Sequence, residues 1–310
     1  MLNLYRRGVL GVAGIKPVAN VMQRYGTRLG ARRFVAGDDV AEALPALEAL
    51  RTSGREAIVD VLGEYVTTRD AARAMAAQVA IAIETLTRAG VAPVVSVKPT
   101  QVGLALDEAF AADQVLTLAL DAEAAGGKLA LDMEDARYVD ATLALLERVW
   151  AGGAVRASGV LQAYLHRTPD DLEAMIAAAP DPTALEVRIV KGAYAERPEL
   201  VKRDMSAVRA AFTALCERAW RAGARVNVAT HDERLILEAA AFARGARLAP
   251  EKLEFQLLYG VKPGLQRSLV DAGQRVRIYV PIGRDWYGYF SRRLAERPAN
   301  LAVVLRGLVG

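Results

Sequence analysis

The chain has 310 residues, of which 53% are hydrophobic and 25% are charged, and this length and composition are typical of a soluble protein with a substantial core. Basic residues outnumber acidic ones only by 40 to 36, so we expect a mixed-charge surface and no nucleic-acid partner. The single cysteine, Cys216, excludes an internal disulfide and is typical of a reducing cytoplasm. No apolar run approaches the roughly 18 residues of a membrane span, and we expect no signal peptide.

Residues 1–54 precede the first predicted strand and are expected to form a helical segment that packs on the following domain. Basic side chains alternate there with apolar ones at roughly helical spacing: Arg6, Arg7, Lys16, Arg24, Arg28, Arg32 and Arg33. Packing against the domain is the favoured interpretation of this pattern. Contact with an anionic bilayer, as a peripheral membrane protein, remains the alternative.

Short β-type runs alternate with long alanine- and leucine-rich helical patterns through residues 55–310, which indicates a parallel sheet built from β/α units. Eight runs can be placed, at residues 57–61, 94–97, 129–131, 157–160, 187–190, 226–228, 253–256 and 276–279. Each is followed by enough chain for a crossover helix. The sequence therefore predicts one α/β domain, a closed (β/α)8 barrel of the TIM type.

Polar residues interrupt the predicted strands mainly where each strand ends. They are Glu64, Lys98, Asp132, Gln162, Arg188, Lys191, Thr230, His231 and Tyr279. In a closed barrel these ends converge on the face where active sites are assembled. This convergence predicts an enzyme before any family is considered.

Metal chemistry is disfavoured by the residue types available. The acidic stretch 132–135 could bind Mg²⁺ or form an ordinary polar loop, but it is the one cluster of oxygen ligands at these ends. His166 and His231 are too few for a histidine-rich zinc site, and Cys216 has no nearby histidine to activate it. We therefore expect no metal.

A final helix is predicted to begin at Asp285, a good N-cap, directly after the eighth strand. It would place Tyr289, Arg292 and Arg293 on one face, because residues three and four apart are neighbours on a helix. A fork of guanidinium donors suits a planar carboxylate. This helix is therefore a candidate substrate-binding element.

Taken in order, the motifs resemble the catalytic barrel of the proline dehydrogenases from about residue 64 to residue 296. The resemblance rests on the segments at 131–134 (LDME), 188–194 (RIVKGAY), 229–231 (ATH) and 255–260 (FQLLYG), and on Tyr289 three residues before Arg292 and Arg293. DNA-binding and aldehyde dehydrogenase regions are not recognised in these 310 residues. The chain thus resembles the short, monofunctional bacterial type.

The resemblance implies FAD as cofactor and L-proline as substrate. Hydride would pass from carbon 5 of proline to the flavin, giving 1-pyrroline-5-carboxylate in the first step of proline degradation to glutamate. A membrane quinone would then accept the electrons, and a separate pyrroline-5-carboxylate dehydrogenase would use the product. The absence of a Rossmann fingerprint agrees with a cofactor held by barrel loops.

The same resemblance implies roles for particular residues. Those expected to hold FAD are Met133, Gln162, Arg188, Val190, Lys191, Gly192, Ala193, Thr230 and His231. Those expected to bind proline are Lys98, Leu258, Tyr279, Tyr289, Arg292, Arg293 and Glu64. Arg188 would stabilise negative charge on the flavin, Asp132 would fix Lys98 and act with Arg188 in catalysis, and Glu64 would close over the site by pairing with Arg292.

Two other functions remain as alternatives. One is a different flavin barrel resembling methylenetetrahydrofolate reductase, against which the Arg292 and Arg293 pair argues, since it favours a small amino acid. The other is a basic anion-binding scaffold, suggested only by a pI near 9.2 and lacking a basic stripe interleaved with aromatic residues.

Overall fold

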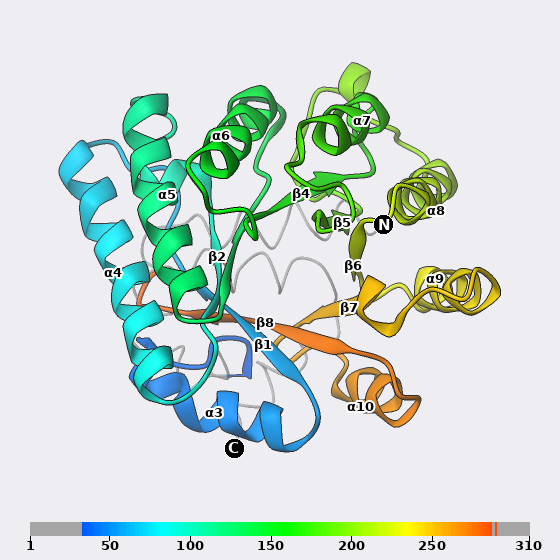
Figure 1. The fold of residues 1–310 in the computed structure, drawn as a ribbon, viewed down its shortest axis with the longest axis horizontal. Coiled ribbons are helices and arrows are strands. Elements are labelled where there is room, and N and C mark those ends of the chain that lie inside the picture. Colours follow the sequence, from blue (N-terminus) through cyan, green and yellow to red (C-terminus); the bar gives the residue numbers. More distant parts are fainter. Residues whose placement is uncertain (1–32, 287–288, 290–310) are drawn as a thin grey trace, which may run out of the picture.

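Eight parallel strands close into a barrel in the order β1 to β8 (Figure 1). The structure is a computed structural model that describes residues 33–286 and 289. The strands are β1 (Glu56–Val61), β2 (Val94–Val97), β3 (Lys128–Leu131), β4 (Ser158–Gln162), β5 (Glu186–Val190), β6 (Arg225–Ala229), β7 (Leu253–Leu258) and β8 (Val276–Ile282). All eight predicted strands are confirmed, as is the barrel.

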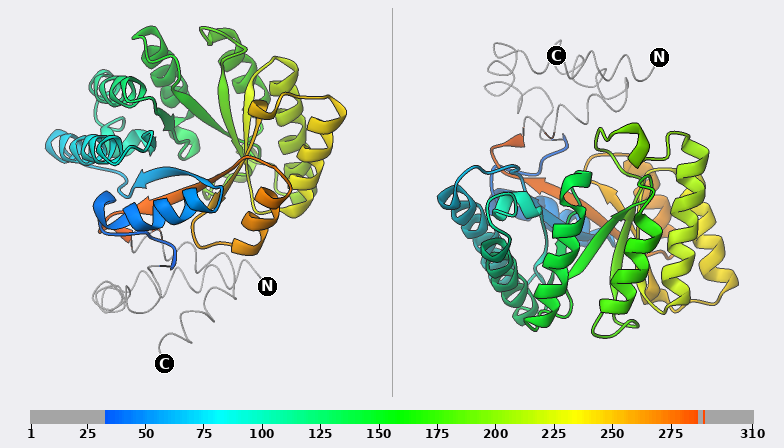
Figure 2. Two further views of the ribbon diagram at one scale, coloured as in Figure 1. Left: turned by 60° about the horizontal axis from the view of Figure 1, so that its bottom comes forward. Right: turned by 90° about the horizontal axis from the view of Figure 1, so that it is seen from above.

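Helices surround the barrel and follow the strands in turn (Figure 2). They are α4 (Arg69–Arg88), α5 (Glu108–Ala124), α6 (Val139–Ala151), α7 (Thr168–Ala178), α8 (Met205–Arg221), α9 (Glu233–Gly245) and α10 (Pro263–Asp271). Side-chain caps define several starts: Thr68 accepts from the amide of Ala71, and Asp107 from that of Phe110. Cys216 is buried in α8. No helix in residues 33–286 is long and apolar enough to cross a membrane.

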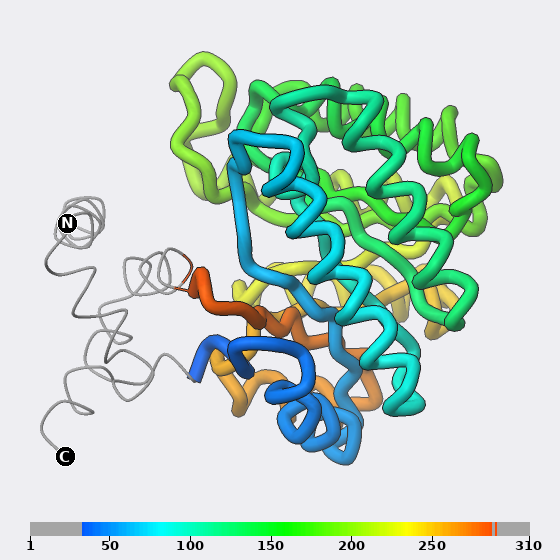
Figure 3. The backbone as a smooth tube through the Cα atoms, turned by 90° about the vertical axis from the view of Figure 1, so that its left-hand side faces the viewer, coloured from blue at the N-terminus to red at the C-terminus, as the bar shows by residue number. Residues whose placement is uncertain are grey.

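Helix α3 (Val40–Thr52) precedes the barrel in sequence but belongs to its outer ring (Figures 1 and 3). It begins at the N-cap Asp39 and contacts β1, β8 and α4. It therefore fills the place that the helix after β8 takes in a regular barrel. The predicted segment 1–54 is described only from residue 33, and the predicted final helix only at Asp285, Trp286 and Tyr289. The rest of both predictions lies outside the described residues.

Alternation along the strands separates two environments. One set of strand residues packs against the helices in the main core and is aliphatic or aromatic, for example Val95, Leu129, Ile189, Val228 and Phe255. The other set faces the barrel interior. There polar side chains extend well below the strand ends, as the buried Ser96, Glu186, Asn227, Glu254 and Arg277 show. The expectation that polar residues interrupt the strands mainly at their ends was therefore wrong.

Candidate active site at the carboxyl ends of the strands

A cavity of about 680 Å³ opens at the carboxyl ends of β3 to β8. This volume is within the range of roughly 300–1,000 Å³ that is typical of small-molecule and cofactor sites. Its lining includes all nine residues predicted to hold a cofactor, together with the predicted Asp132, Leu258 and Tyr279. Closure of the barrel thus gathers residues from six strands, spread over about half of the chain, around one space.

Arg188 lies in the barrel interior, with hydrogen-bond partners on β7 and directly after β3. It is the third of the five residues of β5 rather than its last, so its side chain lies deeper than we expected. Its Nη1 donates to Oδ1 of Asp132 at 2.5 Å and its Nε to Oε1 of Gln256 at 2.6 Å. The remaining nitrogen, Nη2, is buried and has no hydrogen-bond partner among the described residues. The guanidinium is therefore held by two neighbours, has one nitrogen without a partner among the described residues, and belongs to a residue that lines the cavity.

Asp132 connects Arg188 to Tyr279. Its second oxygen, Oδ2, accepts from the hydroxyl of Tyr279 at 2.6 Å, and the Tyr279 ring lies 5.4 Å from the Arg188 guanidinium. Burial, and then the negative charge of Asp132, raise the pKa of Tyr279 well above its ordinary value, so the phenol stays protonated and donates. Tyr279 lies within β8, which continues to Ile282, and so does not end the strand as we expected.

Lys98 pairs with Asp60 and not with Asp132, which corrects the expected contact. Its Nζ lies 2.7 Å from Oδ1 of Asp60, and both side chains are almost fully buried. Burial alone would lower the pKa of Lys98, but the charges of Asp60 and Asp132 outweigh it and raise that pKa, so the lysine is cationic. Sequence reasoning passed over Asp60, although a charged residue inside the run 57–61 was a visible signal.

The far end of the cavity is rich in cationic side chains. Lys191 lies 3.5 Å from Asp232, which also accepts from Nε of Arg209 at 2.8 Å. Lys262, which pairs with Glu233, completes this group and donates to the carbonyl of His231 at 3.1 Å. Arg209, Asp232 and Lys262 were missed because they lie in helices or loops beyond the strand ends that we considered.

Two backbone features shape the same wall. His231 accepts from the amide of Leu258 through Nε2 at 3.1 Å, so that nitrogen carries no proton. Gly192 follows β5 with φ of +105°, and a Cβ there would lie 2.1 Å from the ring of Tyr164. Only glycine fits. Glycine at this position thus lets the Tyr164 ring pack against the backbone, and Gly192 itself lines the cavity.

The predicted substrate-binding residues are only partly assembled by the described residues. Leu258 and Tyr279 line the cavity; Lys98, Glu64 and Tyr289 are not among its lining residues in the described part of the chain. Tyr289 is buried, and Glu64 lies partly buried in the loop after β1. Arg292 and Arg293 lie outside the described residues. The carboxylate clamp and the pairing of Glu64 with Arg292 therefore stay predictions.

Glu134 is a fully buried carboxyl group beneath this face, whereas the sequence suggested only a polar loop or a metal ligand. Its carboxylate accepts from the backbone amide of Thr100 at 2.8 Å and from the hydroxyl of Thr100 at 2.7 Å. Its carbonyl accepts from the side chain of Gln162 at 2.7 Å. Burial raises the pKa of Glu134 to about 7, because the two bonds from Thr100 only partly offset it.

This raised pKa predicts a measurable pH dependence of stability. The folded state binds the Glu134 proton more tightly than the unfolded state, so the contribution to stability is complete below the unfolded pKa and is lost as pH rises through about 7. Between pH 5 and pH 8, wild type should lose up to about 3 kcal/mol of unfolding free energy relative to Glu134→Gln. Urea unfolding of both proteins measures the difference.

The matched control is Glu147→Gln, the same change at an exposed position on α6, which should track wild type across this range. A constant difference between wild type and Glu134→Gln at pH 5 and pH 8 would contradict the expected titration.

The fold and the cavity together are those of a (β/α)8-barrel enzyme, a class in which active sites lie at the carboxyl ends of the strands. The model of the proline dehydrogenase family matches residues 43–306. The chain therefore belongs to the proline dehydrogenase family and acts on proline, which decides against both alternatives considered above.

Individual relatives agree with this assignment. The chain is 38% identical to "Proline dehydrogenase" of Deinococcus radiodurans over 99% of its own length and 98% of that protein. It is 35% identical to "Proline dehydrogenase 1" of Bacillus subtilis strain 168, over 95% of each chain. A crystal structure of proline utilization A from Bdellovibrio bacteriovorus, inactivated by N-propargylglycine, has the same fold with a TM-score of 0.81 at 22% identity. That match covers 89% of this chain and 33% of the other.

Proposed function

We propose that this protein is an FAD-dependent proline dehydrogenase that oxidises L-proline to 1-pyrroline-5-carboxylate, in the first step of proline degradation to glutamate. The observation that supports this best is the free Nη2 of Arg188, a buried cationic donor beside a cavity lined by the nine residues expected to hold FAD. The family assignment supplies the substrate.

The residues present fit the cofactor. Met133, Gln162, Val190, Gly192 and Ala193 line the cavity. Thr230 and His231 form the next part of the wall, followed by the cationic side chains of Lys191, Arg209 and Lys262, which suit a diphosphate. When bound, FAD supplies the acceptor for a hydride and its electron pair.

Oxidation of proline removes two electrons and two hydrogens, a hydride from carbon 5 and a proton from the ring nitrogen. Negative charge therefore develops on the acceptor, and the fixed charge of Arg188 would stabilise it. Asp132 and Gln256 hold the guanidinium in place, so little reorganisation is needed during the reaction.

Proline itself would be held by its carboxylate and covered on its ring. Lys98 is cationic and buried beside Asp60, and we propose that it binds the carboxylate together with Arg292 and Arg293. Leu258, Tyr279 and Tyr289 would pack on the pyrrolidine ring, and Glu64 would close the site against water. These contacts hold carbon 5 in a reactive position.

The onward path of the electrons follows from the family resemblance. We propose a membrane quinone as acceptor, with the protein in the cytoplasm and in peripheral contact with the inner face of the membrane. A separate pyrroline-5-carboxylate dehydrogenase would consume the product. The basic stretch proposed for membrane contact lies almost wholly in residues 1–32, outside the described residues.

An absorbance spectrum tests the proposal directly. The purified protein should be yellow, and L-proline added without oxygen should bleach the flavin band, whereas acetate, a carboxylate with no amine, should not. A colourless protein that does not take up added FAD, or a flavin band unchanged by proline, would refute the proposed function.

A further inference from the structure

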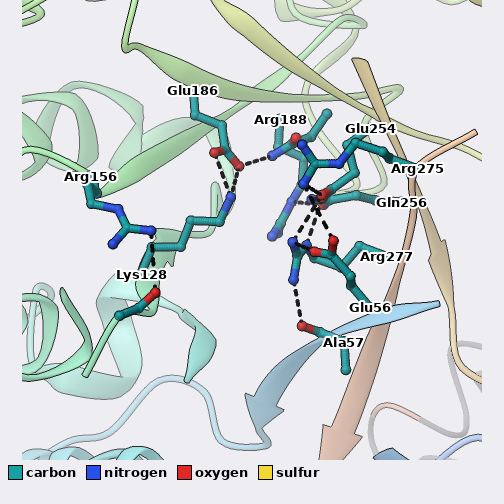
Figure 4. Close-up of polar contacts among 12 residues, drawn as sticks. Glu56, Ala57, Lys128, Arg156, Glu186, Arg188, Glu254, Gln256, Arg275 and Arg277 are labelled. Atoms are coloured by element: carbon teal, nitrogen blue, oxygen red, sulfur yellow. Dashed lines mark hydrogen bonds and ion pairs between the residues drawn. The ribbon is translucent and has the colours of Figure 1, made fainter. Parts of the chain in front are cut away.

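A chain of buried hydrogen bonds connects Arg188 to the lower part of the barrel interior (Figure 4). Gln256 accepts from Nε of Arg188 at 2.6 Å and donates through Nε2 to Oε1 of Glu254 at 2.8 Å. Glu254 accepts in turn from two nitrogens of Arg277, at 2.8 and 3.0 Å. All four side chains are almost fully buried. None of the roles assigned above explains why a glutamine stands at position 256.

Glu254 determines which way the Gln256 amide faces. A glutamine side chain can present either its oxygen or its NH₂ group, whereas an ionised carboxylate only accepts. Burial would raise the pKa of Glu254, but the charge and hydrogen bonds of Arg277 outweigh it and lower that pKa to about 2. The amide must therefore direct its NH₂ to Glu254 and its oxygen to Arg188, which has only donors.

This arrangement has two consequences for Arg188. With Nε bonded to Gln256 and Nη1 to Asp132, the guanidinium cannot rotate, and Nη2 is left without a partner in the described part of the chain. Moreover, Gln256 is neutral. Among the described residues, Asp132 is the one carboxylate hydrogen-bonded to Arg188, so the amide orients the guanidinium without cancelling its charge.

We propose that Gln256 is a positioning residue for Arg188. Oriented by Glu254, it supplies a neutral hydrogen-bond acceptor that holds the guanidinium with Nη2 free for the electron-accepting group. Because this acceptor carries no charge, the positive charge of the guanidinium is preserved. This inference rests on the proposed function, since the accepting group is taken to be FAD. A carboxylate at position 256 would also orient Arg188, but it would add a second negative charge beside a guanidinium that already pairs with Asp132.

The variant Gln256→Glu tests the electrostatic part. FAD should remain bound, because no residue expected to hold it is changed, but its reduction should become less favourable. We expect the equilibrium between oxidised and reduced FAD to shift at least tenfold toward the oxidised form, about 30 mV for a two-electron couple. The measurement is the reduction potential of the bound FAD, which does not depend on proline turnover. Gln78→Glu, the same change at an exposed position on α4, should leave the potential unchanged.

A double variant separates this role from a merely structural one. Glu254→Gln combined with Gln256→Glu exchanges the amide and the carboxylate, so the carboxylate at position 256 accepts from Arg188 and from the amide at position 254. One contact is lost, because Oε1 of Glu254 accepts from both Gln256 and Nε of Arg277, and an NH₂ group in its place cannot accept from Arg277. Gln256→Glu alone places two carboxyl groups side by side and should lower the melting temperature, whereas the double variant removes that repulsion and should recover part of the loss. FAD bound to the double variant should nevertheless keep the lowered reduction potential, because the carboxylate at position 256 still lies beside Arg188.

Two results would overturn the inference. A wild-type potential in folded, FAD-loaded Gln256→Glu overturns the inference. So does a double variant that regains the wild-type potential together with its stability, because the role is then structural. If Gln256→Glu alone does not fold, the same measurement is made on the double variant, which has no pair of adjacent carboxyl groups. Failure of the proposed function is distinct, because it appears in wild type as a protein without FAD or a flavin that proline does not bleach.

Discussion

Replacing Arg188 with methionine is expected to slow the bleaching of bound FAD by L-proline at least about a hundredfold, roughly 2.7 kcal/mol in the barrier. Methionine fills part of the same volume but removes both the charge and the free Nη2 donor beside the cavity. It also leaves Oε1 of Gln256 without its donor and Asp132 with Tyr279 as its remaining described partner. Stopped-flow absorbance under anaerobic conditions measures the rate.

Arg188→Lys is the informative control for this prediction. Lysine keeps the positive charge but cannot bond Gln256 and Asp132 at once with the planar fork of arginine. Its rate should therefore lie between wild type and Arg188→Met. If Arg188→Met bleached within about twofold of wild type, well under 1 kcal/mol, Arg188 would have no part in the reaction.

Replacing Asp60 with asparagine should lower the free energy of unfolding by about 3 kcal/mol or more, because it leaves the buried ammonium of Lys98 without its charged partner. Lys98→Met should lower the free energy of unfolding by a similar amount, because it leaves the buried carboxylate of Asp60 without its cationic partner. The double variant Asp60→Leu with Lys98→Met removes both charges, and most of the lost stability should return, since apolar replacements of a buried ion pair are often near neutral. Urea unfolding measures all three.

Activity distinguishes the two roles of this pair. The double variant should be stable yet bind proline weakly, because the cation proposed for the carboxylate is gone. The exposed pair of Glu48 and Arg51 on α3 is the matched control, since Glu48→Gln breaks an ion pair of 2.6 Å that water screens, and stability should change little. An Asp60→Asn protein as stable as wild type would show that Lys98 does not depend on Asp60.

Much of the fold could be predicted from the sequence because the signals are local. A run such as 94–97, apolar and bounded by turn residues, followed by a helical pattern such as α5, specifies a β/α unit without reference to the rest of the chain. Eight such units leave few ways to bury every strand on both faces, and closure is one of them. Parallel strands then bring their carboxyl ends to one face, which is why residues chosen by sequence position line one cavity.

The pairing of side chains inside the barrel depended on the tertiary structure. Alternation predicts that Asp60, Lys98 and Asp132 can face the interior, but which carboxylate reaches which cation depends on strand tilt and stagger. In the structure, Lys98 forms an ion pair with Asp60, and Arg188 forms one with Asp132. Gln256 and Glu134 also depend on the tertiary structure. The Gln256 oxygen accepts from Arg188, which is 68 residues away in sequence, and the raised pKa of Glu134 follows from its burial in the closed barrel, only partly offset by Thr100, 34 residues away. Local patterns determine which elements form, whereas hydrogen-bond partners and burial exist only once those elements have closed around a common interior.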